Sequence, residues 1–116
     1  MTLHLFGIPN CDTVKRARSF LGQHSIEHDF HDFKRQGLAP QHVDRWIDAL
    51  GWERLLNRQG TTWRRLDEAA RDRVVDASSA RGLMLASPSL IKRPVVEWPD
   101  GAVTVGFDPK QWSDRL

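Results

Sequence analysis

The chain has 116 residues, enough to bury a core of its own, so we expect a single domain over residues 1–116. Its 17 Lys and Arg residues are interspersed with 15 Asp and Glu residues, and a net charge of +2 fits a solvated surface better than a nucleic-acid-binding one. No apolar stretch has the length of a membrane span or the character of a signal peptide. We therefore expect a soluble, cytoplasmic protein that makes no membrane contact.

The first third of the chain predicts a βαβ unit. Residues 2–7 alternate in polarity, as a half-buried strand does, and Ile8-Pro9-Asn10 interrupts the alternation as a turn. A helix follows, which we expect Asn10 to cap and Gly22 to end. Alternation resumes over residues 26–33 as a second strand. Open α/β sheets bind ligands where strands end and helices begin, so the turn before the helix is a candidate site.

The middle of the chain predicts a helical insertion over about residues 38–87. Pro40 suits the first turn of a helix that carries an apolar stripe, and Gly51 is a natural end for that helix. We expect residues 57–62 to form a polar loop and Asp67 to cap the next of several short helices.

The C-terminal part predicts a hairpin, because β-rich runs at residues 94–98 and 102–107 flank a short Asp-Gly turn. Asp108-Pro109 can begin a last short helix. The predicted fold class is therefore α/β, in a βαβ…ββα arrangement with a mixed sheet of about four strands and an inserted helical subdomain.

Cys11 is the only cysteine, so its partner in any disulfide must belong to another molecule. It lies at the start of the predicted helix, where unpaired N–H groups and the helix dipole favour a thiolate. Lys15 and Arg16 add positive potential, which Asp12 opposes. The alternative interpretation is a small buried apolar residue, as free cysteines often are. The residues around Cys11 leave both interpretations open.

Other polar clusters predict no further site. His28 and His31 point to opposite faces of the second predicted strand and cannot jointly bind a metal, so we assign no metal site. The basic doublets Lys34-Arg35 and Arg64-Arg65 lack aromatic neighbours suited to base stacking, so we expect no nucleic-acid partner.

Three separated segments of the sequence closely resemble the ArsC/Spx family, and within it the YffB-like branch. They are GIPNCDTVKRA at residues 7–17, LLNRQGTTWRRL at 55–66 and LIKRPVV at 90–96. The resemblance implies a thioredoxin-like fold and a reactive thiol at Cys11. It also implies that Arg93 faces this thiol and that the peptide bond to the following Pro94 is cis. A guanidinium beside the thiol would offer fork-like donors to an oxyanion or carboxylate. The other residues expected to bind substrate or anion are Asn10, Asp12, Thr13 and Lys15 near the thiol, and Asn57 and Arg58 on the resemblance alone.

The sequence departs from its relatives at positions that bear on the substrate. The resemblance to arsenate reductases of this type implies a histidine four residues before the cysteine and two further arginines at the oxyanion site. This chain has Gly7, Asn57 and Gly106-Phe107 at those places. Spx-type regulators sense oxidation with a Cys-x-x-Cys pair, whose second position is Val14 here. The departures argue against arsenate reduction and against an intramolecular disulfide switch.

We therefore predict a glutathione-dependent thiol-disulfide oxidoreductase that uses one nucleophilic cysteine, with glutathione as co-substrate and no bound cofactor. The expected partners are glutathione and a small oxidised or anionic substrate, or a protein disulfide, and we expect a monomer. The alternative is a non-catalytic, Spx-like redox-sensing regulator that binds a protein such as RNA polymerase through Gly51 and its helical surroundings. Catalytic consumption of glutathione distinguishes the two.

Overall fold

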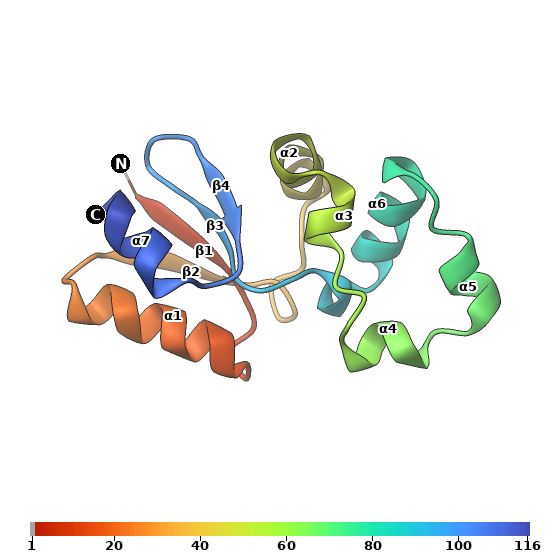
Figure 1. The fold of residues 1–116 in the computed structure, drawn as a ribbon, viewed down its shortest axis with the longest axis horizontal. Helices are drawn as coiled ribbons and strands as arrows, with labels where there is room; N and C mark the ends of the chain where they lie inside the picture. The colour runs from red at the N-terminus through yellow and green to blue at the C-terminus, as the bar shows by residue number, and fades with distance from the viewer. Residues whose placement is uncertain (1) are drawn as a thin grey trace. The chain divides into compact units, whose positions relative to one another are not determined.

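The computed structural model describes residues 2–116 (Figure 1). The chain forms two compact units, one made of residues 2–36 and 93–116 and the other of residues 37–92. The first unit contains the four strands, and the second is helical. The helical segment is thus inserted in the chain between the two halves of the sheet unit, with bounds of 37–92 compared with the predicted 38–87.

The sheet has four strands in the order β2-β1-β3-β4. They are β1 (Leu3–Gly7), β2 (His28–Asp32), β3 (Val95–Glu97) and β4 (Val103–Val105). β1 pairs with β2 in parallel and with β3 antiparallel, and β4 pairs antiparallel with β3. The predicted mixed sheet of a thioredoxin-like fold is confirmed.

Two helices cover one face of this sheet, namely α1 (Asp12–Gln23) and α7 (Pro109–Arg115) (Figure 1). α7 begins at Pro109 because the Asp108 carboxylate accepts hydrogen bonds from the next free backbone N–H groups, the one to Lys110 at 3.0 Å. Trp112 of α7 packs edge-on against Trp98, with ring centroids 5.2 Å apart. These helices and the sheet share an apolar core that includes the buried residues Leu3, Leu5, Val14, Ala17, Leu21, Val96, Trp98 and Trp112.

The helical unit contains five α-helices and one 3₁₀ helix within its described residues. They are α2 (Pro40–Leu50), α3 (Trp52–Leu55), α4 (Thr61–Arg65), α5 (Glu68–Asp72), α6 (Ala77–Ala86) and η1 (Pro88–Leu90). The predicted features at Pro40, Gly51 and Asp67 are confirmed, since Pro40 begins α2, Gly51 follows it with φ +83°, and the Asp67 carboxylate accepts from the Ala70 N–H at 2.7 Å. The predicted polar loop over residues 57–62 is wrong at its end, because α4 begins at Thr61.

The prediction that Gly22 ends the first helix is also wrong. α1 runs through Gly22 to Gln23, and the chain reverses at Ser25, which has φ +56°. The Ile26 N–H then donates to the Leu21 carbonyl at 2.9 Å, so the last carbonyls of the helix are satisfied without a glycine in the left-handed position.

The predicted half-buried character of the first strand fails at Phe6, which is 3% exposed. The register places Phe6 between His31 of β2 and Val95 of β3, on the sheet face opposite to Leu5. The Phe6 and His31 rings stack with centroids 4.4 Å apart. β1 is therefore buried on both faces near its carboxyl end, which period-two alternation does not reveal.

None of the helices within residues 2–116 combines the length and the apolar character needed to cross a membrane.

Candidate active site

The strand that leads to the cysteine ends at Gly7, which packs closely against α1. A Cβ atom at position 7 would lie 2.8 Å from Cγ2 of Val14, closer than side chains approach one another. Val14 is itself fully buried. A histidine at position 7 would clash with Val14, so the departure from the relatives' motif at Gly7 has a structural basis.

Cys11 lies at the N-cap position of α1, at the carboxyl end of β1. Its backbone is extended, with φ −142° and ψ 123°, and its carbonyl accepts the first helical hydrogen bond from the Lys15 N–H at 2.9 Å. The prediction that Asn10 caps the helix and that Cys11 occupies the first turn is therefore wrong by one position. Cys11 takes the cap position because it is the last residue with extended dihedral angles.

The Cys11 side chain is half-buried and contacts the edge of the apolar core. It is thus neither a fully buried core residue nor a fully solvated one. Of the polar residues predicted around it, Thr13 is half-buried, and Asn10, Asp12 and Lys15 are exposed. Asp12 is the first residue of α1, where its charge favours the helix but opposes a thiolate.

Arg93 and Pro94 lie at the same edge of the sheet as the turn before Cys11. β3 runs antiparallel to β1 with Phe6 opposite Val95, so continuing the register brings Gly7 opposite Pro94. The Arg93–Pro94 peptide bond is cis, at the position where the resemblance implies one. Arg93 is half-buried and its Nε atom is enclosed by the protein. The Arg93 guanidinium is therefore partly enclosed by the protein and not fully solvated.

Gly106 is hydrogen-bonded to this segment, and Phe107 follows it in the chain. Gly106 has φ +84°, a conformation that favours glycine, and its N–H donates to the Pro94 carbonyl at 2.8 Å. Phe107 packs edge-on against Trp112, with ring centroids 4.8 Å apart. Of the two positions near which the resemblance implies a further arginine, Gly106 thus holds the proline segment, Phe107 packs against α7, and neither supplies a cation.

Asn57 and Arg58 belong to the helical unit. The Asn57 side-chain oxygen accepts from the Gln59 N–H at 3.1 Å, and a Cβ at Gly60 would lie 2.8 Å from the Asn57 amide nitrogen. Arg58 places its guanidinium 5.8 Å from the centre of the Trp52 ring. Asn57 therefore organises a local turn, and a role of either residue toward an anion stays a prediction.

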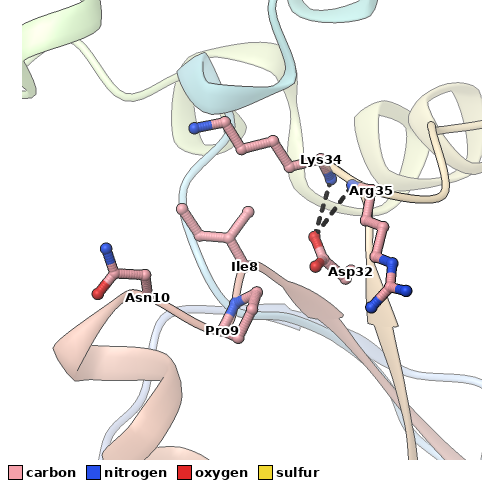
Figure 2. A pocket seen from close by; sticks show the side chains of 6 residues that line it. All are labelled: Ile8, Pro9, Asn10, Asp32, Lys34 and Arg35. Atoms are coloured by element: carbon pink, nitrogen blue, oxygen red, sulfur yellow. Dashed lines mark hydrogen bonds between the residues drawn. The ribbon is translucent and has the colours of Figure 1, made fainter.

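A cavity of about 390 Å³ opens beside the turn that precedes Cys11 (Figure 2). Its lining residues are Ile8, Pro9, Asn10, Asp32, Lys34 and Arg35. The Lys34-Arg35 doublet is predicted from the sequence only not to bind nucleic acid, so this cavity is not expected from the sequence. The signal that could have found it is position, since the doublet directly follows the second strand of a parallel pair whose first strand leads to Cys11.

Histidines on the sheet also pair with neighbours. His4 Nδ1 lies 2.9 Å from His31 Nε2 on one face, whereas His28 lies on the other and receives a hydrogen bond from Arg18 Nε at 3.3 Å. Burial, and next the nearby Arg18 guanidinium, lower the pKa of His28 below its usual value. Within residues 2–116 no three His, Cys, Asp or Glu side chains are grouped so that they could hold a metal ion.

This protein is therefore a thioredoxin-like protein of the class that carries one cysteine at the helix N-cap after β1 and a cis-proline before β3. The chain belongs to the ArsC family, whose sequence profile matches residues 6–114. It is similar to a solved structure described as YFFB (PA3664) protein, with 47% identity, a TM-score of 0.93 and 99% of each chain covered.

Two further relatives support this assignment. The solution structure of an arsenate reductase (ArsC) related protein from Brucella melitensis is 51% identical, with a TM-score of 0.78, 98% of this chain and 93% of that chain covered. An uncharacterized protein of Haemophilus influenzae is 39% identical over 108 residues, which are 93% of each chain. The similarity therefore spans nearly the whole chain.

Proposed function

We propose that this protein is a glutathione-dependent thiol reductase in which Cys11 is the nucleophile. The observation that carries the proposal is the placement of Cys11, half-buried at the N-cap of α1 and at the sheet edge that also bears Arg93 and the cis-proline. The N-terminal N–H groups of α1 favour negative charge on the sulfur, and a guanidinium at this edge suits an anionic substrate. Family membership supports a thiol-based reductase chemistry.

The reaction needs two equivalents of glutathione, because the protein has a single cysteine. The Cys11 thiolate attacks one sulfur of a disulfide substrate, forms a mixed disulfide and releases the other half as a thiol. The thiolate of a first glutathione displaces the bound half and leaves glutathione on Cys11. A second glutathione then attacks this adduct, which releases oxidised glutathione and restores the Cys11 thiolate. The substrate gains two electrons and two protons, and two glutathiones become one disulfide.

The packing around the site argues against arsenate as the substrate. A side chain at position 7 would clash with Val14, Gly106 is hydrogen-bonded to Pro94, and Phe107 packs against Trp112. Arg93 alone then remains of the arginines that the resemblance to arsenate reductases implies.

The test begins with the mixed disulfide. Wild-type protein incubated with oxidised glutathione should gain the mass of one glutathione, and Cys11→Ser should gain none. Turnover is then followed with glutathione, a panel of disulfides and arsenate, by coupling oxidised glutathione to its NADPH-dependent reductase. Adduct formation without any turnover would favour the redox-sensing alternative, and absence of the adduct on reduced protein would overturn the proposal.

Arg93 provides the second arm of the test. Arg93→Ala should lower kcat/KM by about 10- to 100-fold, the equivalent of one charge-assisted hydrogen bond. Arg93→Lys should lower kcat/KM less, because lysine keeps the positive charge but lacks the two-pronged geometry of the guanidinium. Arg64→Ala is the control, because that guanidinium donates to the Gln59 carbonyl within the helical unit. Equal values of kcat/KM for Arg93→Ala and Arg64→Ala would show that Arg93 does not bind the substrate.

A further inference from the structure

The cavity beside the turn that precedes Cys11 has the position of a ligand site. Parallel strands β1 and β2 end at the same edge, and the cavity lies between the segments that follow them (Figure 2). One wall is formed by Ile8, Pro9 and Asn10, and Asn10 directly precedes Cys11. A molecule held here therefore lies beside the loop that carries the thiol. At about 390 Å³ the cavity is within the range of small-molecule sites.

The opposite wall is a turn whose backbone is fixed by Asp32. Its Oδ1 atom accepts from the Lys34 N–H at 3.1 Å and from the Arg35 N–H at 3.2 Å, and its carbonyl accepts from the Gln36 N–H at 2.8 Å. Phe33 is buried, and its N–H donates to the Gly7 carbonyl at 3.1 Å. The turn is thus tied to the end of β1, and the two cationic side chains project from a positioned backbone.

The charges in the cavity suit a peptide with more than one carboxylate. Lys34 and Arg35 are exposed, and Figure 2 shows their cationic ends extending in different directions from the turn, so the two can serve two separate anionic groups. Asp32 adds a negative charge to the same lining, which favours a ligand that also carries an ammonium group. Ile8 and Pro9 supply apolar contact, and the Asn10 amide can donate to or accept from a peptide bond.

We propose that this cavity binds the peptide part of glutathione, with Lys34 and Arg35 on its two carboxylates. The inference rests on the proposed function for the choice of glutathione, a tripeptide thiol with two carboxylates and one ammonium group. Asn10 lines the cavity and directly precedes Cys11, so this assignment puts the glutathione sulfur at the Asn10 side of the cavity. Lys34 and Arg35 are binding residues in this assignment and take no part in the exchange of disulfide bonds.

Binding is tested without chemistry, using Cys11→Ser protein and S-methylglutathione, which together cannot form a disulfide. Titration followed by amide NMR should shift signals of residues 8–10 and 32–35. Lys34→Ala and Arg35→Ala, each in the Cys11→Ser background, should weaken binding by about tenfold, as expected for loss of one charge-assisted contact. Lys110→Ala is the matched control, since Lys110 is an exposed cation on α7 and does not line the cavity. Glutarate serves as a dicarboxylate probe without peptide or ammonium groups.

The outcomes separate this inference from the proposed function. If the wild type forms the glutathione adduct but Lys34→Ala and Arg35→Ala bind S-methylglutathione as the control does, the cavity assignment is overturned and the function stands. If the wild type forms no adduct but the binding depends on both cations, the cavity assignment stands and the reductase proposal fails. Absence of shifts at millimolar S-methylglutathione, or equal affinity for glutarate, overturns the tripeptide assignment.

Discussion

Gly7→Ala tests the packing that shapes the turn before Cys11. The new methyl group would lie 2.8 Å from Cγ2 of fully buried Val14, where ordinary contacts begin at 3.4 Å. Overpacking of this kind costs about 1–3 kcal/mol. Replacing glycine also reduces the conformational freedom of the unfolded chain, which raises the free energy of unfolding by about 0.4–1 kcal/mol. We therefore expect Gly7→Ala to lower the free energy of unfolding by about 1–2 kcal/mol, measured by urea denaturation with tryptophan fluorescence.

A double-mutant cycle with Val14→Ala isolates this contact. Val14→Ala removes the clashing methyl and should itself cost about 2 kcal/mol through lost apolar burial and a new cavity. In that background the methyl of Gly7→Ala has room, so its cost should vanish or reverse. The two substitutions should then couple favourably by about 1–2 kcal/mol, well above the error of additivity between distant sites.

Gly22→Ala is the control for the glycine effect. A Cβ at Gly22, on α1, meets nothing within 4 Å, so this change should raise stability by up to about 1 kcal/mol through helix propensity. If Gly7→Ala behaves as Gly22→Ala does, or costs the same with and without Val14→Ala, then the close approach of β1 and α1 does not exist, and the steric argument against a histidine at position 7 fails with it.

Three further predictions concern stability. Asp108→Ala should lower the free energy of unfolding by about 1 kcal/mol in urea denaturation, because α7 loses its side-chain cap, whereas Asp108→Asn should retain most of it. Gly51→Ala should cost about 1–3 kcal/mol by the same measurement, since φ +83° with ψ 144° is open almost only to glycine; an unchanged midpoint would contradict this conformation. For His28 the folded pKa lies below the unfolded value of 6.5, so its contribution is complete above about pH 6.5 and is lost as the pH falls below it. His28→Gln, which can still accept from Arg18, should therefore lose less stability than the wild type between pH 7 and pH 5, and parallel losses would show that His28 does not titrate with a lowered pKa.

The parts of the fold that depend on neighbours in the chain are predictable from the sequence. The helix caps at Asp67 and Asp108 and the turn at Gly101 involve contacts within a few residues, and the structure contains all of them. Cys11 after the first strand belongs to the same group, since a strand, a turn and a helix in succession place it at a strand end. Local periodicity and capping chemistry act over the distance that a sequence pattern spans.

Local patterns failed where a second contact competed with the predicted one. The helix passes through Gly22 because hydrogen bonds around Ser25 close its end. Phe6 is buried on the predicted polar face because the strand pairing places it between His31 and Val95. For Phe6 the deciding partners are distant in the chain, and for Gly22 they are residues 24–26, just beyond the residues that carry the helical pattern.

The assembly of the site required the tertiary structure. The strand, turn and helix pattern indicates Cys11 and the family resemblance adds Arg93, but nothing in the sequence distinguishes Lys34 and Arg35 from an ordinary basic doublet. Only the register of β1 with β2 and β3 brings the segments that carry these residues to one edge of the sheet. That register is set by hydrogen bonds and buried faces between strands distant in the chain, and no local periodicity specifies which strands pair or how they align.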